Sequence, residues 1–477
     1  MDLNQLTEQI NFLDGLVWQP FAMPLILVIV GGLITLATGV VQIRRFPMAL
    51  RMVTRGAFAK ATSGRTITPF QALSTALAST VGNGNIGGVA TAILIGGPGA
   101  VFWMWVCATV GMATKYAEAV LGVHYRVTRE NGDLASGPMY YITRGITTPG
   151  LGRTLAILFA FFGAVTALLG TGNMAQSNTV ARTFVAAYAA ITGQTIAQWI
   201  PGIIITVAVA LVLLGGIKRI AAVAERLVPS MIVLYVAAAL VFIVINAAEL
   251  PHVFGLIFTE AFTPTAPVGG FVGATVAQSI AAGVSRGVLS NEAGLGSAPI
   301  AHGMADVRHP AEQGVVGIFE VFIDTIVVCS MTAFVILQSG LWTEGQFQQA
   351  SGDLTAAAMS TTIPGATIIV AISSFLFGFS TLIGWYYYGE KCFEFLFGSS
   401  FTIVYRTVYT ILIMVGAVAS VPLVWAIGTL LNGFMAFPNL IGLLFLLGMV
   451  RRITVDYFAG GARQYSVEHP TTGARIA

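Results

Sequence analysis

Long apolar runs separated by short polar segments dominate this chain and set its expected architecture. About 20 apolar residues in a helix cross a bilayer, and runs of that length recur along the whole sequence. We predict eleven transmembrane helices, at residues 20–42, 68–95, 100–123, 154–176, 199–216, 227–246, 268–289, 314–338, 366–388, 401–420 and 422–449. The apolar spacing in residues 1–19 is nearly helical, which predicts an amphipathic helix on the outer membrane face.

Positive charges orient the predicted helices. Lys and Arg gather in alternate loops, beginning with Arg44, Arg45 and Arg51 after the first helix. Because loops rich in Lys and Arg stay in the cytoplasm, we place the N-terminus outside and the tail, residues 451–477, in the cytoplasm. We therefore expect a multi-pass protein of the cell inner membrane.

Composition agrees with a membrane protein. Of the 477 residues, 56% are hydrophobic and 9% are charged, whereas soluble domains carry about 25% charged residues. No Gly-Lys pair and no H-E-x-x-H pattern occurs, so neither direct ATP drive nor zinc proteolysis is expected. The three cysteines lie in or beside apolar runs and imply no disulfide framework. We expect lipid and a small molecule as partners, no nucleic acid, and no enzymatic activity.

The run at residues 68–95, TPFQALSTALASTVGNGNIGGVATAILI, has no charge but is interrupted in the middle. Gly82, Asn83, Gly84 and Asn85 are poor helix formers, so we predict a broken helix there. Broken backbone at membrane depth is tolerated only where it is buried in protein or lines a cavity. A packing seam of small residues is the alternative. The stretch also matches G-x-G-x-x-G, but it lacks the strand and the acidic residue of a nucleotide site.

A second stretch resembles the first one. Residues 274–283 are small, polar and interrupted by glycine, like residues 75–84, and five helices separate the two starts. The two units therefore have opposite orientation, which is typical of inverted-repeat transporters. We predict repeats at residues 68–247 and 267–450, joined by an external loop at 248–266. An extra helix and a cytoplasmic loop, residues 20–67, precede them.

Five stretches resemble the alanine or glycine:cation symporter family. They are ALSTALASTVGNGNIGGVATA at 72–92, SGPMYYI at 136–142, GNMAQSN at 172–178, GVSRGVLSNEAGLGSAPI at 283–300 and TLIGWYYYGEK at 381–391. The resemblance implies an all-α leucine-transporter fold with one extra N-terminal helix. It also implies sodium-coupled uptake of small neutral amino acids such as alanine and glycine. A proton-coupled or glutamine-preferring transporter of the same fold is the alternative, and we expect a monomer.

The substrate is expected at the two interruptions. Exposed backbone N–H groups at the first break can hold a carboxylate, and carbonyls freed at 279–283 can accept from the amine. By resemblance Gln176 reaches the pocket, although a helix–helix hydrogen bond is the alternative. The expected substrate residues are Thr80, Gly82, Asn83, Gly84, Gln176, Ser279, Ala281, Gly283 and Trp385.

Sodium sites follow from the resemblance. The leucine-transporter pattern implies that carbonyls of Ala78 and Val81 face the hydroxyls of Ser380 and Thr381. Ordinary bonding of these hydroxyls back to their own helix is the alternative. A second sodium site would use Asn85 and the carbonyl of Thr80.

Several charged residues fall inside or beside the predicted helices. Glu320 and Asp324 lie four apart on one helical face, and acids within a membrane are candidates for function. A sodium ligand, a proton-sensitive gate or a partner for Arg286 all remain open for them. Arg286 and Glu292 are expected in a cytoplasmic gate. Lys115 and Glu118 are three apart and are expected to pair.

Overall fold

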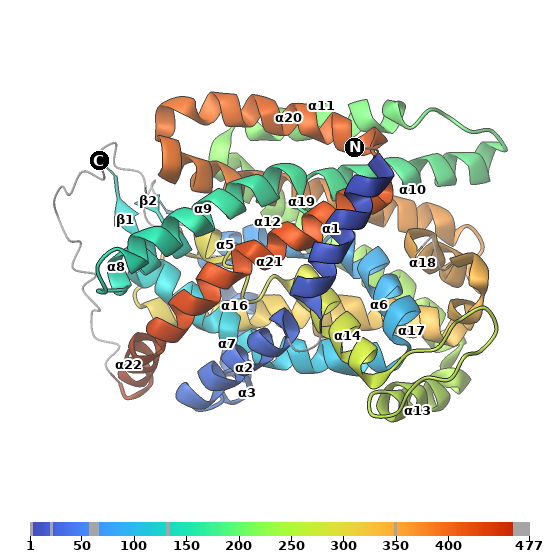
Figure 1. Ribbon diagram of the computed structural model, residues 1–477, viewed down its shortest axis with the longest axis horizontal. Helices are drawn as coiled ribbons and strands as arrows, with labels where there is room; N and C mark the ends of the chain where they lie inside the picture. The colour runs from blue at the N-terminus through green and yellow to red at the C-terminus, as the bar shows by residue number, and fades with distance from the viewer. Residues whose placement is uncertain (1–2, 20–21, 57–65, 130–133, 348–350, 461–477) are drawn as a thin grey trace.

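The computed structural model describes residues 3–19, 22–56, 66–129, 134–347 and 351–460, and it is almost entirely helical (Figure 1). The longer helices are α1 Leu3–Trp18, α2 Met23–Ala37, α5 Pro69–Thr80, α7 Gly99–His124, α9 Leu151–Leu169, α10 Met174–Thr192, α11 Trp199–Leu213, α12 Gly216–Ile245, α14 Val276–Asn291, α16 Pro310–Val321, α19 Ala366–Phe397, α20 Thr402–Val418, α21 Val421–Phe445 and α22 Leu447–Phe458.

Shorter elements complete these helices. They are α3 Val41–Arg44, α4 Phe46–Gly56, α6 Val89–Gly96, α8 Pro138–Gly145, α13 Leu250–Glu260, α15 Pro299–His302, α17 Ser330–Ser339 and α18 Ser351–Ser360, the π-helical turns η1 Gly84–Gly88 and η3 Phe322–Cys329, and the 3₁₀ turns η2 Ala247–Glu249, η4 Leu341–Thr343, η5 Gly345–Phe347 and η6 Ser399–Phe401. One antiparallel hairpin pairs β1 Val127–Thr128 with β2 Leu134–Ala135.

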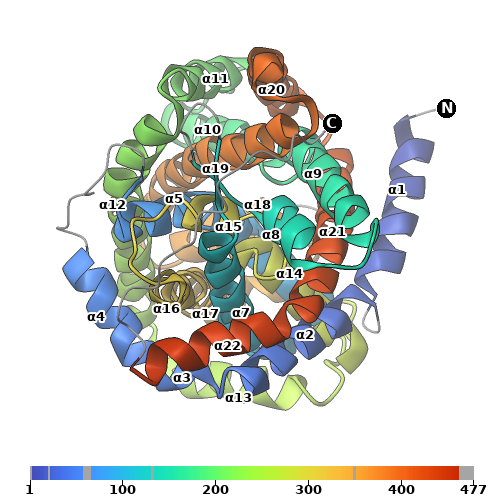
Figure 2. The same cartoon turned by 90° about the vertical axis from the view of Figure 1, so that its left-hand side faces the viewer.

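The helices form one bundle around buried central elements. Helix α7 packs against α14, α16 and α2, while α19 packs against α9, α10 and α12. Figure 2 shows α1, α11 and α20 at the outside of this bundle. Large apolar side chains remain exposed on the outer helices, among them Leu211 and Val244. Such a surface suits lipid rather than water. By length and composition, seven helices in the described part can cross a membrane.

Helices α5 and α14, which open the two interrupted segments, both begin with a capping box. The hydroxyl of Thr68 accepts from the Gln71 N–H, and the Gln71 side chain accepts from the Thr68 N–H, both at 3.0 Å. Thr275 and Gln278 form the same capping box at the start of α14. A capping box satisfies two N–H groups that a helix start leaves unpaired. It therefore fixes where α5 and α14 begin.

Several predicted spans are wrong in their limits: the helix expected at 227–246 begins at Gly216, and the helix expected at 366–388 continues to Phe397. The helix expected at 268–289 begins only at Val276, because Gly269 and Gly273 adopt positive φ and turn the preceding chain. It then continues to Asn291. The helix expected at 154–176 is divided into α9 and α10 by a non-helical turn at residues 170–173. The predicted external loop at 248–266 contains helix α13.

The two ends of the chain agree only partly with expectation. Residues 1–19 form the predicted helix over Leu3–Trp18, and Trp18 Nε1 donates to the Thr429 carbonyl of α21 at 3.0 Å. Its position on the outer membrane face stays a prediction. The predicted tail, residues 451–477, begins inside α22, and its residues 461–477 lie outside the described part.

Candidate substrate and ion site

The predicted break in the first interrupted helix is confirmed. Helix α5 ends at Thr80, Val81 is extended with ψ 93°, and the chain winds again only from Gly84. Side chains hold the freed backbone: the Gly82 N–H donates to Asn85 Oδ1 at 2.8 Å. The Asn83 N–H donates to Gln176 Oε1 at 3.1 Å. The break is therefore a fixed, buried feature.

The second break lies later than predicted. Residues 279–283 are continuous α-helix, and the helix ends at Asn291, followed by the non-helical residues 292–298. Glu292 takes a left-handed conformation with φ 57° at this point. The glycine at 283 serves packing, because a Cβ there would lie 2.3 Å from the Ala100 carbonyl oxygen of α7. Likewise, the Ser279 hydroxyl donates to the Gly96 carbonyl.

A small cavity lies between the two breaks. Its volume of about 20 Å³ is little more than one water needs, so the surrounding segments are closed around it. It is lined by Ser79, Thr80, Gly82, Gly84, Gly88, Thr171, Gln176, Arg286, Leu289, Glu292, Thr381, Trp385 and Trp425. Five predicted substrate residues belong to this lining: Thr80, Gly82, Gly84, Gln176 and Trp385. Asn83, Ser279, Ala281 and Gly283 do not line it, and their contact with substrate stays a prediction.

Gln176 bridges the segments around this cavity. Its Oε1 accepts from both the backbone and the side-chain amide of Asn83 at 3.1 Å. Its Nε2 donates to the Thr171 carbonyl at 2.9 Å. Ser374 of α19 donates to Asn83 Oδ1 at 2.6 Å. Asn83 therefore ties the first break to α10 and α19 through its hydrogen bonds. Gln176 both lines the cavity and links α10 to the first break.

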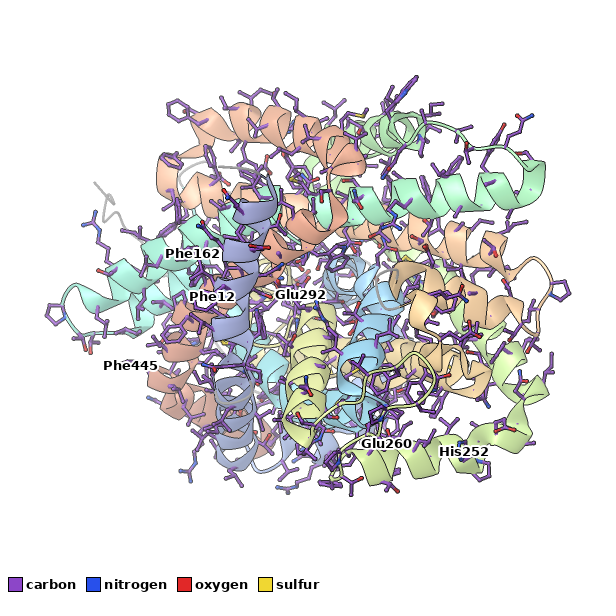
Figure 3. The ribbon with its side chains drawn as sticks, turned by 45° about the vertical axis from the view of Figure 1, so that its right-hand side comes forward. Phe12, Phe162, His252, Glu260, Glu292 and Phe445 are labelled. Carbon is purple, nitrogen blue, oxygen red and sulfur yellow. The ribbon has the colours of Figure 1, made fainter. Side chains whose placement is uncertain are left out.

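The cavity is lined by a carboxyl group, Glu292, and a guanidinium group, Arg286, which form no ion pair with each other. Glu292 lies in the interior at the end of α14, whereas Phe12 and Phe445 point outward (Figure 3). Trp385 Nε1 donates to Glu292 Oε1 at 2.6 Å, and the Ser297 hydroxyl donates to Oε2 at 2.5 Å. No carboxylate of the described residues lies within 4 Å of the Arg286 guanidinium nitrogens.

Hydroxyl groups of α19 approach the first break. Ser380 Oγ lies 3.5 Å from the Val81 carbonyl oxygen and donates to the Phe377 carbonyl at 2.9 Å. Thr381 Oγ1 is buried and has no hydrogen-bond partner in the described part of the chain. Ala78 is buried at the same end of α5. Carbonyl and hydroxyl oxygens suit a hard cation, so these residues fit the implied sodium ion.

This arrangement predicts an effect on the sodium dependence of transport. Thr381→Val keeps the side-chain shape but removes the unpaired oxygen. We expect about tenfold weaker sodium activation of transport, equivalent to about 1.4 kcal/mol, because a cation ligand is lost. The measurement is the sodium dependence of uptake at saturating amino acid. Thr407→Val, on the exposed face of α20, should leave that dependence unchanged; an unchanged Thr381→Val would contradict the assignment.

Asp324 forms a second polar centre. It is fully buried in η3, where its Oδ1 accepts from Asn85 Nδ2 at 2.7 Å. Its Oδ2 accepts from the hydroxyls of Ser290 and Thr325, each at 2.8 Å. The acid therefore connects the first break, α14 and η3. Asn85 belongs to this centre rather than to the group around Thr381.

Glu320 occupies a separate buried network. It forms an ion pair with Lys115 at 3.0 Å and bonds His302 Nε2 at 2.7 Å, so it is not a partner of Arg286. The expected Lys115–Glu118 pair is also wrong, because Glu118 accepts from Asn439 Nδ2 at 2.7 Å. Sequence reasoning missed His302. The signal was the run at 293–304, AGLGSAPIAHGM, which is too apolar for an exposed loop.

Comparison with known proteins identifies the family. The model of the sodium:alanine symporter family matches residues 3–469. The chain belongs to the sodium:alanine symporter family. It is 45% identical over 445 residues to the sodium/alanine symporter AgcS of Methanococcus maripaludis, covering 92% of this chain and 95% of that protein. Membership of this family makes the chain a multi-pass membrane transporter and not an enzyme.

Other curated proteins are similar in sequence, and solved structures are similar in fold. The chain is 38% identical to the probable sodium/glutamine symporter GlnT of Bacillus subtilis, over 95% of this chain and 91% of that one. In fold it resembles MhsT in complex with L-phenylalanine, with a TM-score of 0.54 and 13% identity over 83% of this chain and 99% of MhsT. It also resembles a mutant of the Eremococcus coleocola manganese transporter, with a TM-score of 0.52 and 14% identity over 84% and 91% of the two chains.

Proposed function

We propose that this chain is a secondary active transporter that takes up small neutral amino acids, alanine and glycine, together with sodium by alternating access. The observation that carries the proposal is the meeting of two helix breaks at one closed cavity, where a guanidinium and a carboxylate lie without pairing. Discontinuous helices that meet in this way form substrate sites in many transporters. The family supports an amino acid as the substrate and sodium as the ion.

The charges of the cavity suit a zwitterion. A substrate carboxylate would pair with Arg286 and with the backbone N–H of Gly84, since the N–H of Gly82 already donates to Asn85. The substrate ammonium would lie near Glu292. Each charge then has a partner after leaving water, which avoids the cost of a buried lone ion. Because the cavity is nearly filled and bounded by Trp385, the smallest amino acids fit with the least rearrangement.

Sodium would connect this binding to the membrane gradient. We place one ion between the carbonyls of Ala78 and Val81 and the hydroxyls of Ser380 and Thr381. The Asp324 centre with Asn85 is the second candidate ion site. One charge moving inward gains about 2.3 kcal/mol per 100 mV, and a tenfold sodium gradient adds about 1.4 kcal/mol. Together they could concentrate an amino acid several-hundredfold.

Alternating access needs parts that move as units. The buried network of Lys115, Glu320 and His302 ties α7, α15 and α16 together. The bond from Trp385 to Glu292 joins α19 to the end of α14. We propose that the first network moves as one body and that the Glu292 contacts change as the cavity opens. Arg286, Glu292, Glu320 and Asp324 thus keep their proposed roles in gating.

The architecture we propose is an inverted repeat of five plus five helices, residues 68–247 and 267–450, with one extra N-terminal helix. The matching capping boxes at Thr68 and Thr275, each opening an interrupted helix, support it. The likeness in fold to MhsT supports it too. We further propose a monomer in the cell inner membrane with its N-terminus outside and its C-terminus in the cytoplasm.

Two relatives favour an alternative function on the same fold. One bears the description probable sodium/glutamine symporter, and another, 35% identical over 92% of this chain and 90% of that protein, is a putative sodium/proton-dependent alanine carrier of Bacillus subtilis named YrbD. A glutamine-preferring or proton-coupled transporter is therefore the second candidate. Competition of unlabelled alanine, glycine and glutamine against labelled alanine distinguishes the substrates.

Uptake into proteoliposomes tests the proposed coupling. We expect labelled alanine to accumulate when sodium is high outside. When potassium replaces sodium on both sides, we expect alanine to reach equal concentrations inside and outside, without accumulation. The physical reason is that an ion site without sodium leaves its oxygens unpaired and the substrate site incomplete. Protein-free liposomes are the control. Equal accumulation in sodium and potassium would reject sodium coupling, and accumulation driven by a proton gradient alone would favour the alternative.

A further inference from the structure

A second cavity lies far from the substrate site, between the turn that follows α2 and the helix α22. Its volume is about 300 Å³, enough for a charged headgroup. It is lined by Thr38, Gly39, Val41, Arg44, Arg45, Thr454, Val455, Phe458 and Ala459. Figure 1 shows α3 and α22 near each other at one end of the molecule. The positive-inside pattern of the sequence places this end at the cytoplasmic membrane surface.

The two arginines of this cavity are held in place but not neutralised. The Arg45 guanidinium lies 4.0 Å from the centre of the Phe458 ring, and Arg44 Nη1 donates to the Gly39 carbonyl at 3.3 Å. No described carboxylate lies within 4 Å of either guanidinium. The nearby acid Asp456 is directed to His309, at 3.7 Å. Among the described residues, the cavity therefore presents two positive charges without an anion.

The turn between α2 and α3 has a strained backbone conformation. Gly39 and Val40 both adopt the left-handed region, with φ 65° and 57°. A β-branched residue is rarely found there. The turn ends α2 and starts α3, which places Arg44 and Arg45 beside α22. Strain of this kind persists where the surrounding structure requires it.

Exposed apolar surface accompanies the rim of the cavity. Val455 of its lining has 58% of its surface exposed, and Leu36 and Ile43, within two residues of lining residues in the sequence, have 76% and 61% exposed. A free inorganic anion gains nothing from such a rim, whereas the acyl chains of a lipid do. We propose that this cavity binds the phosphate-bearing headgroup of an anionic phospholipid, with Arg44 and Arg45 on the phosphate and the acyl chains along the rim. Guanidinium groups recognise phosphate strongly because their donors match its oxygens.

Binding of phosphatidylglycerol to the purified full-length protein, followed by native mass spectrometry, tests this site. The double variant Arg44→Gln/Arg45→Gln should bind phosphatidylglycerol about thirtyfold more weakly, because each charge near an anionic lipid contributes about a factor of five. The matched control Arg451→Gln/Arg452→Gln removes two positive charges from α22 outside the cavity lining. It should reduce binding no more than about fivefold. Phe458→Leu keeps both charges but removes the ring under Arg45, and should weaken binding about threefold.

Two further probes distinguish the sources of the phosphate group. Phosphatidylcholine carries the same phosphate beside a quaternary ammonium, so it should bind the wild type more weakly than phosphatidylglycerol and lose less affinity in the double variant. Inorganic phosphate at millimolar concentration should not displace phosphatidylglycerol. Displacement by phosphate would overturn the lipid assignment in favour of a free anion. Equal losses in the two double variants would overturn the site itself, and so would an unchanged Arg44→Gln/Arg45→Gln. These results do not depend on alanine transport.

Discussion

Gly82→Ala is expected to lower the rate of alanine uptake by about tenfold to a hundredfold, the effect of an overpacking cost of about 1–3 kcal/mol. A Cβ at this position would lie 2.5 Å from Thr381 Oγ1 and 3.4 Å from both amide atoms of Gln176. The methyl group therefore disturbs the proposed ion site and the link between α10 and the first break at once. The measurement is the initial uptake rate in proteoliposomes, together with alanine binding in detergent.

Two other glycines make this experiment specific. Gly32→Ala in α2 has no atom within 4 Å of the new Cβ and should transport like the wild type. Gly84→Ala has its nearest neighbours at 3.9 Å, so we expect it to fold with similar yield while binding alanine more weakly, since it adds a methyl group to the cavity. Wild-type uptake by Gly82→Ala would mean that the break does not belong to the transport site.

The first break was predictable because two residue types in the sequence, glycine and asparagine, both indicate it. Glycine weakens the helix, and asparagine supplies a side chain that can replace a lost backbone partner, as Asn85 does for the Gly82 N–H. The same reasoning failed at 279–283. A small residue such as Gly283 permits either a break or close packing, and only the approach of α7 shows which of the two applies. The actual break at Glu292 requires a left-handed residue that is not glycine, and composition gives no signal of that.

The polar partners of the site could not be predicted from spacing either. Sequence periodicity indicates neighbours three or four apart on one helix. It suggested the pair Lys115–Glu118, whereas Lys115 pairs with Glu320 on another helix. Glu292 and Trp385 are 93 residues apart and meet only when the folded chain brings the residue after α14 to α19. The sequence thus identified the residues of several pairs correctly but not their partners.

Arg286→Gln is expected to weaken alanine binding by about tenfold to a hundredfold. The guanidinium lines the cavity. Asp14 is the described carboxylate that acts on it electrostatically, but it forms no ion pair within 4 Å, so a substrate carboxylate would be a closer partner. A hydrogen bond to a charged group contributes about 1.5–3 kcal/mol. The measurement is the dissociation constant for alanine at saturating sodium. The matched control is Arg182→Gln, because Arg182 is half exposed and pairs with Asp353 at 3.7 Å, a surface contact of little energetic weight.

A comparison of ligands separates pairing with the substrate from a role in gating. Ethylamine has the ammonium group of alanine but no carboxylate, so it should bind equally weakly to the wild type and to Arg286→Gln. Only alanine should lose affinity, and Arg286→Lys, which keeps a positive charge, should recover part of the loss. If Arg286 acted only as a gate, alanine affinity would stay unchanged in Arg286→Gln while the maximal transport rate fell. That outcome would remove the guanidinium from the substrate site and leave the backbone of the first break as the proposed partner of the carboxylate.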